Sequence, residues 1–137
     1  MLSRPVQDDL GDVGPAIAWV GDILDAAGLS PDIRFAVDLG LEEALANLII
    51  HGVALVGDKD IELSVTASSV EALVAITDRC APFDVTDTAN EPHPAEFDVG
   101  GRGLRLLRAA VSDLSYASAD GRNTLTLRFA GSLAQVA

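Results

Sequence analysis

The stretch SPDIRFAVDLGLEEALANLIIHG, residues 30–52, decides the fold. Its opening Ser-Pro-Asp is typical of a helix start, in which serine caps free amides, proline occupies the first turn and the acid faces the positive end of the helix dipole. We therefore expect one long helix that ends at about His51 and the glycine after it. Glu43, Asn47 and His51 recur every fourth residue, so they lie along one narrow stripe of that helix.

A second polar pair, Asp38 and Glu42, lies nearly opposite this stripe. A half-buried helix needs only one polar face in water, so we expect one of these two rows of polar side chains to line a cavity. A carboxylate, an amide oxygen and an imidazole in a cavity can transfer a proton or hold a hydrated metal ion. Glutamate and asparagine are also common on solvated helix faces, so the stripe by itself leaves a purely structural interpretation open.

Periodicity in the rest of the chain predicts the other elements. Apolar residues at helical spacing predict a helix over residues 11–27, ended by Gly28. Strands are expected at about residues 61–67, 72–78, 113–117 and 124–129, the last two joined at Asp120-Gly121, with a short edge strand near residues 3–7. The strand at 72–78 is apolar on both parities, which predicts a central position covered on both faces. This order predicts a two-layer α+β domain with a mainly antiparallel sheet.

Composition and charge limit the class of protein. The 137 residues, 49% of them hydrophobic, fit a single domain over residues 1–137. No apolar segment reaches the roughly 20 residues of a membrane span, and the lone Cys80 allows no internal disulfide, so we expect a soluble, cytoplasmic protein without membrane contact. The net charge of −12 argues against direct nucleic-acid binding and suits a basic partner, although acidity also serves solubility alone.

A candidate ligand residue stands where the buried strand at 72–78 ends. Asp78 is followed by Arg-Cys-Ala-Pro-Phe, and a carboxylate at a strand end can accept a hydrogen bond from the exocyclic amine of a ligand. An Asx-type turn followed by a proline would give the same sequence without any ligand.

A long segment without sustained periodicity, about residues 84–99, precedes a run of glycines. Loops of this length in compact domains are usually functional lids or disordered segments. Gly100, Gly101 and Gly103 then open a helix, where free amides attract phosphate and glycine lets a ligand approach the backbone. A tight turn is the alternative interpretation of these glycines.

Taken together and in this order, the motifs resemble those of the GHKL ATPase superfamily, and within it the small anti-sigma factors that are also serine kinases. The matching motifs are Glu43-x-x-x-Asn47-x-x-x-His51 (N box), Asp78-x-x-x-Pro82-Phe83 (G1 box), Gly101-x-Gly103-Leu104 (G2 box) and Gly121-Arg122-Asn123-Thr124-Leu125 (closing strand). The resemblance implies a Bergerat ATP-binding fold, an α+β two-layer sandwich whose mixed, mainly antiparallel sheet carries helices on one face.

The resemblance also implies roles for individual residues. Glu43 would be the general base, Asn47 would hold Mg²⁺, and Asp78 would accept a hydrogen bond from the adenine amino group of ATP. A lid over about residues 84–101 would close on the nucleotide. Gly101 and Gly103, with Leu104 completing the motif, would contact the phosphates, and Gly100 would give the lid freedom to close.

The implied function is an ATP-dependent serine/threonine protein kinase and anti-sigma factor of a bacterial partner-switching pathway. Such a protein phosphorylates an anti-anti-sigma (STAS) protein, sequesters a sigma factor and usually forms homodimers. Its substrates are proteins, and it makes no direct contact with nucleic acid.

One position departs from the family pattern. Cys80 stands where the G1 box has glycine, and a side chain there is expected to weaken the approach of the adenine to the backbone. Replacing Cys80 with glycine is then expected to tighten ATP binding. The departure keeps an alternative open, in which the chain is a non-catalytic interaction module of the same fold that binds a regulator with weak or no ATP binding.

Overall fold

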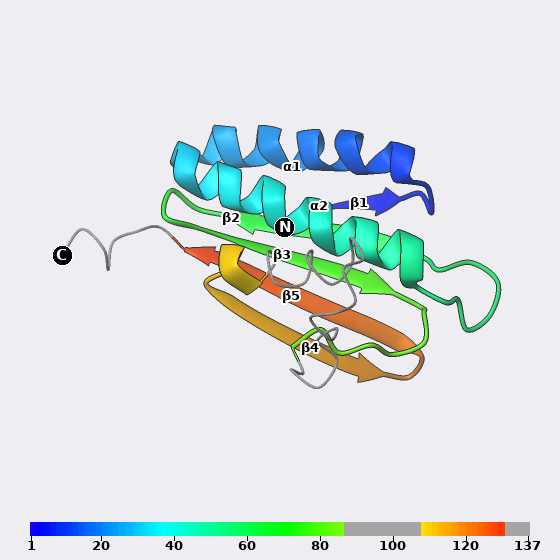
Figure 1. The fold of residues 1–137 in the computed structure, drawn as a ribbon. Helices are drawn as coiled ribbons and strands as arrows, with labels where there is room; N and C mark the ends of the chain where they lie inside the picture. Colours follow the sequence, from blue (N-terminus) through cyan, green and yellow to red (C-terminus); the bar gives the residue numbers. More distant parts are fainter. Residues whose placement is uncertain (87–107, 131–137) are drawn as a thin grey trace, which may run out of the picture.

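Two helices cover one face of a five-stranded sheet (Figure 1). The computed structural model describes residues 1–86 and 108–130. The elements are β1 (Leu2–Val6), the 3₁₀ turn η1 (Leu10–Asp12), α1 (Val13–Ala27), α2 (Pro31–His51), β2 (Ile61–Ala67), β3 (Glu71–Asp78), β4 (Asp113–Ala119) and β5 (Arg122–Ala130). The strand order is β1-β2-β3-β5-β4, and every pairing among these strands is antiparallel. The predicted α+β fold is confirmed.

The helix boundaries follow from the local signals in the sequence. Gly28 ends α1 with a φ of 81°, a left-handed conformation that costs glycine little. The Ser30 hydroxyl accepts a hydrogen bond from the Ile33 amide, which is the capping contact expected at the start of α2. The helices predicted over residues 11–27 and 30–52 are confirmed, and the second one ends at His51 as expected. Most of the helix expected after the glycine run lies outside the described residues.

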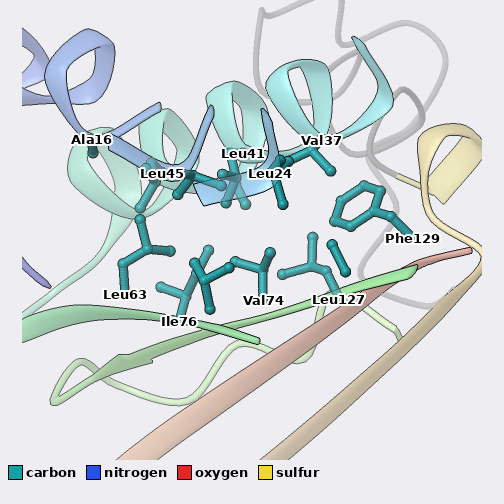
Figure 2. Close-up of a cluster of buried hydrophobic side chains, with 14 of the residues drawn as sticks. Ala16, Leu24, Val37, Leu41, Leu45, Leu63, Val74, Ile76, Leu127 and Phe129 are labelled. Atoms are coloured by element: carbon teal, nitrogen blue, oxygen red, sulfur yellow. The ribbon is translucent and has the colours of Figure 1, made fainter. Parts of the chain in front are cut away.

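The core lies between the two helices and the sheet (Figure 2). Val37, Leu41 and Leu45 recur every four residues on α2 and point at the sheet, so the spacing rule that sets the polar stripe also sets an apolar one. They pack with the other fully buried side chains, among them Leu24, Leu63, Val74, Ile76, Leu127 and Phe129.

One detail of the expected sheet is wrong. The strand β3 is central, but burial alternates along it and Leu73 is 37% exposed, so only the face toward the helices is covered by the described residues. Only two residues of β3 on the other face, Leu73 and Ala75, are apolar, and exposed apolar residues of this number need no second layer.

The closing hairpin is tighter than expected, because β4 and β5 leave only Asp120 and Gly121 between them. Both residues have positive φ, 56° and 77°, as a two-residue hairpin turn of type I′ requires. None of the helices in residues 1–86 and 108–130 has the length and apolar character to cross a bilayer.

Candidate functional site

The end of α2 and the end of β3 meet at one edge of the molecule (Figure 1). Ala54, just after α2, and Cys80, just after β3, form an isolated β-bridge. Beside it the Ala81 amide donates to the Val53 carbonyl over 2.8 Å. These backbone contacts bring the last turn of α2 to the strand end that carries Asp78.

A lysine fixes the end of α2 in place. Lys59 Nζ donates to the Ile49 carbonyl over 2.8 Å and forms an ion pair with Asp8 over 2.8 Å. The last carbonyls of a helix lack partners within the helix and carry partial negative charge, so a cation there stabilises the end. The Lys59 side chain is only 11% exposed, so these contacts are largely shielded from solvent.

Asp78 is a buried acid, 8% exposed, and only one of its two carboxylate oxygens accepts hydrogen bonds from N–H groups. Its Oδ1 accepts hydrogen bonds from the Cys80 amide over 2.9 Å and from Asn123 Nδ2 over 2.8 Å. No hydrogen bond from a described residue reaches Oδ2. Because every fully buried side-chain nitrogen and oxygen of the described residues has a partner, Oδ2 must still reach solvent. The strand end therefore presents one carboxylate oxygen as an acceptor.

Cys80 turns its side chain toward the end of α2. A Cβ placed on Gly52 would lie 3.1 Å from Cys80 Sγ, so the missing side chain at Gly52 leaves room for the thiol. Burial above all, and then the charge of Asp78, raises the pKa of the Cys80 thiol to about 11, so it stays protonated at neutral pH. The Cys80 amide still donates to Asp78. The thiol is therefore buried against the end of α2, and the expected effect of Cys80 on nucleotide affinity stays a prediction.

The stripe on α2 lies on the side away from α1. Asp38, in the opposite row, pairs with Arg34 over 3.3 Å, and Arg34 lies over Gly21 of α1. Glu43 and Asn47 are half-buried and make no hydrogen bond within the described residues. Burial, and secondarily the neighbouring charge of Glu42, raises the pKa of the Glu43 carboxyl.

The third residue of the stripe, His51, is exposed at the end of α2. The amide oxygen of Asn47, which has no hydrogen-bond partner among the described residues, is suited to bind Mg²⁺. The carboxyl of Glu43, with its raised pKa, is suited to act as a general base. No cluster of three or more histidine, cysteine, aspartate or glutamate side chains that could hold a metal occurs in the described part of the chain.

Four predicted site residues lie outside the described residues: Gly100, Gly101, Gly103 and Leu104. The same holds for most of the predicted lid at 84–101, of which the structure describes residues 84–86. Their roles at the phosphates, and the cavity itself, stay predictions.

Sequence reasoning counted Asn123 in the closing-strand motif without giving it a role and did not single out Tyr116; the structure adds both residues to the site. Asn123 is 3% exposed and stands directly opposite Asp78 in the pairing of β3 with β5. Tyr116 donates from its hydroxyl to Asn123 Oδ1 over 3.0 Å. Only the register between strands brings these residues together. The sequence does not reveal that register for Asp78 and Asn123, which are 45 positions apart.

Comparisons with known proteins find chains that are similar in sequence and in fold. Among curated proteins, the chain is 33% identical over 115 residues to the serine/threonine-protein kinase BtrW of Bordetella bronchiseptica, covering 82% of this chain and 81% of that protein. Among solved structures, it is similar to the RsbU and RsbW domains of Rv1364c from Mycobacterium tuberculosis, with a TM-score of 0.65 and 17% identity over 94% of this chain. It spans only 32% of that larger chain.

Two histidine kinases share the fold at lower similarity. The blue-light activated histidine kinase EL346 of Erythrobacter litoralis matches over 91% of this chain and 43% of its own, with a TM-score of 0.57 and 13% identity. Acinetobacter baumannii AdeS matches over 95% of this chain and 68% of its own, with a TM-score of 0.52 and 16% identity. The family model described as histidine kinase-like ATPase domain matches residues 6–129. This chain therefore belongs to the histidine kinase-like ATPase domain family, the GHKL type.

Proposed function

We propose that this protein binds Mg-ATP at the edge where α2 and β3 end and transfers the γ-phosphoryl group to a serine or threonine of a partner protein. The observation that carries the proposal is the Asp78 carboxylate, buried at the strand end with one oxygen held by hydrogen bonds and the other open to solvent. Such an oxygen accepts a hydrogen bond from an exocyclic amine, which adenine has. Membership of an ATPase domain family supports ATP as the ligand.

The stripe on α2 supplies the remaining groups. Asn47 holds the magnesium ion through its amide oxygen, since Mg²⁺ takes few protein ligands beside phosphate oxygens and water. Glu43 takes the hydroxyl proton of the acceptor residue while the acceptor oxygen bonds to the γ-phosphorus and the bond to ADP breaks. A raised pKa suits that role, because a base works best with a pKa nearer the working pH. Gly100, Gly101, Gly103 and Leu104 complete the phosphate site from the lid side.

The proposed partners are an anti-anti-sigma (STAS) protein as phosphate acceptor and a sigma factor that the domain sequesters. The similarity to BtrW, which is named as a serine/threonine-protein kinase, supports the transfer reaction. A net charge of −12 suits capture of a basic partner such as a sigma factor in the cytoplasm. As in the resembling anti-sigma factors, the working form is a homodimer.

Calorimetry with Mg-ATP and a radiolabel transfer assay test this proposal. Asn47→Ala should abolish magnesium-dependent ATP binding, because the metal loses its one protein ligand on α2. Glu43→Ala should bind Mg-ATP as the wild type does and lose transfer by about 100-fold or more, the usual size of a general-base contribution. Glu62→Ala, which removes an exposed carboxylate of β2, is the matched control and should keep both properties.

The alternative function is a non-catalytic interaction module of the same fold. Wild-type protein that shows no heat of binding at millimolar Mg-ATP, while still capturing a regulator from a purified mixture, would leave only that module. Equal transfer by Glu43→Ala and wild type would remove Glu43 from the role of base and leave the binding proposal intact.

A further inference from the structure

A chain of hydrogen bonds runs from the end of β3 to β4 through Asn123. The Phe83 amide donates to the Tyr116 hydroxyl over 3.1 Å, and that hydroxyl donates to Asn123 Oδ1 over 3.0 Å. Asn123 Nδ2 then donates to Asp78 Oδ1 and to the Cys80 carbonyl, each over 2.8 Å. Five residues from three strands and one loop are thus joined through a single side-chain amide.

The amide of Asn123 has only one orientation that satisfies this chain. An amide nitrogen carries two protons, and both are used on the acceptors Asp78 and Cys80. Turning the amide over would place its oxygen against two oxygens and its nitrogen against the donating hydroxyl of Tyr116. At 3% exposure, water cannot replace the lost partners, so Asn123 is fixed.

A fixed Asn123 in turn fixes the carboxylate. Asp78 Oδ1 receives two N–H donors, one from Asn123 and one from the Cys80 amide. The terminal torsion of an aspartate is otherwise broad and nearly twofold, so without these donors the carboxylate would turn. With them, Oδ2 is the oxygen that faces the open side.

We infer that Asn123 and Tyr116 are positioning residues, which hold Asp78 so that its Oδ2 meets the exocyclic amine of a purine. The inference rests on the proposed ATP-binding function. It adds which residues orient Asp78 for recognition of the adenine base. Neither residue touches the nucleotide. Each acts through Asp78, so each should matter only for a base that carries the amine.

Tyr116 is suited to be the outer support. Burial raises the pKa of its phenol, so the hydroxyl keeps its proton over the neutral range and donates it to Asn123. The lone pair left over accepts from Phe83, the first residue after Pro82 on the way to the predicted lid. Loss of the hydroxyl leaves the ring in place and frees the Asn123 amide.

The test compares two nucleotides on four variants by calorimetry. The nucleotides are Mg-ATP and the magnesium complex of purine riboside triphosphate, which has hydrogen in place of the exocyclic amine. Asn123→Ala should weaken ATP binding about tenfold and Tyr116→Phe about threefold, the range expected when one buried hydrogen bond is lost. Binding of the amine-free analogue should stay unchanged in both variants.

Matched controls come from the same strands. Thr126→Ala and Ser115→Ala change two residues that lie opposite each other on β5 and β4, on the other face of the sheet, and that make no side-chain hydrogen bond within the described residues. Both should bind the two nucleotides as the wild type does.

Three results would overturn the inference. An equal loss for both nucleotides means that the variants damage the pocket generally, and unchanged ATP affinity means that Asp78 needs no support. Wild-type protein that binds neither nucleotide defeats the proposed function as well, which separates that failure from the first two. Tyr116→Phe removes a single oxygen atom, so it carries the comparison if Asn123→Ala does not fold.

Discussion

Replacing Gly52 with alanine should destabilise the protein by about 1 to 2 kcal/mol, even though the backbone there suits any residue. The φ and ψ of Gly52 are −63° and 140°, an ordinary extended conformation. The obstacle is space, because a Cβ would lie 2.4 Å from the Leu48 carbonyl oxygen and 3.1 Å from Cys80 Sγ. Both neighbours belong to the edge at which α2 and β3 meet, so neither can move freely.

The magnitude follows from two opposing terms. Overpacking by one methyl group typically costs about 1 to 3 kcal/mol, because neighbours are forced from their preferred positions. The unfolded chain loses freedom when glycine becomes alanine, which offsets about 0.4 to 1 kcal/mol of that cost. The net value is a loss of about 1 to 2 kcal/mol, which urea unfolding measures as a lower midpoint at unchanged slope.

Gly14 provides the matched control for this substitution. It lies in the first turn of α1, and a Cβ there would meet nothing within 4 Å. Gly14→Ala should therefore leave stability unchanged or raise it by up to about 1 kcal/mol, the helix preference of alanine over glycine. If Gly52→Ala is as stable as Gly14→Ala, the close packing of Cys80 and the α2 end is refuted. The double variant Gly52→Ala, Cys80→Ala should recover part of the loss, since the thiol is one of the two close neighbours.

Four further predictions address charge and the thiol. Burial and the charge of Glu42 raise the pKa of Glu43, so ionisation of Glu43 opposes folding, and stability falls as the pH rises above the pKa that Glu43 has in the unfolded chain. Glu43→Gln should therefore have a higher melting temperature than the wild type at pH 7. The difference between the two melting temperatures should disappear below about pH 4. Cys80, buried with a pKa of about 11, should resist a thiol reagent at pH 8 until urea unfolds the chain, and fast labelling of native protein would contradict its packing. In the nucleotide assay, Cys80→Gly should tighten ATP binding, and unchanged affinity would show that the side chain at this position does not hinder the adenine. Lys59→Met removes the cation from the α2 carbonyls and should cost about 1 to 2 kcal/mol in thermal unfolding, whereas Asp8→Asn, which leaves the carbonyl contacts, should cost less.

Local signals let the sequence predict most of the fold. The Ser30 cap and the left-handed Gly28 each act within a few residues, and they place the ends of α1 and α2 correctly. Alternation over residues 61–67 gives β2, and Asp120-Gly121 gives the hairpin turn. The prediction for β3 was right about its central place and wrong about its second face, because an apolar run does not show which side is covered.

By itself, therefore, the sequence determined the helices, the strands, the stripe of Glu43 and Asn47 and the acid at the end of β3, since each depends on neighbours along the chain. Only the tertiary structure decided how that acid is held. The register of β3 with β5 places Asn123 opposite Asp78. The Cys80 thiol packs beside Gly52 because the end of α2 lies next to the end of β3. Contacts between such distant residues arise when the chain closes around its core, and no short-range pattern encodes them.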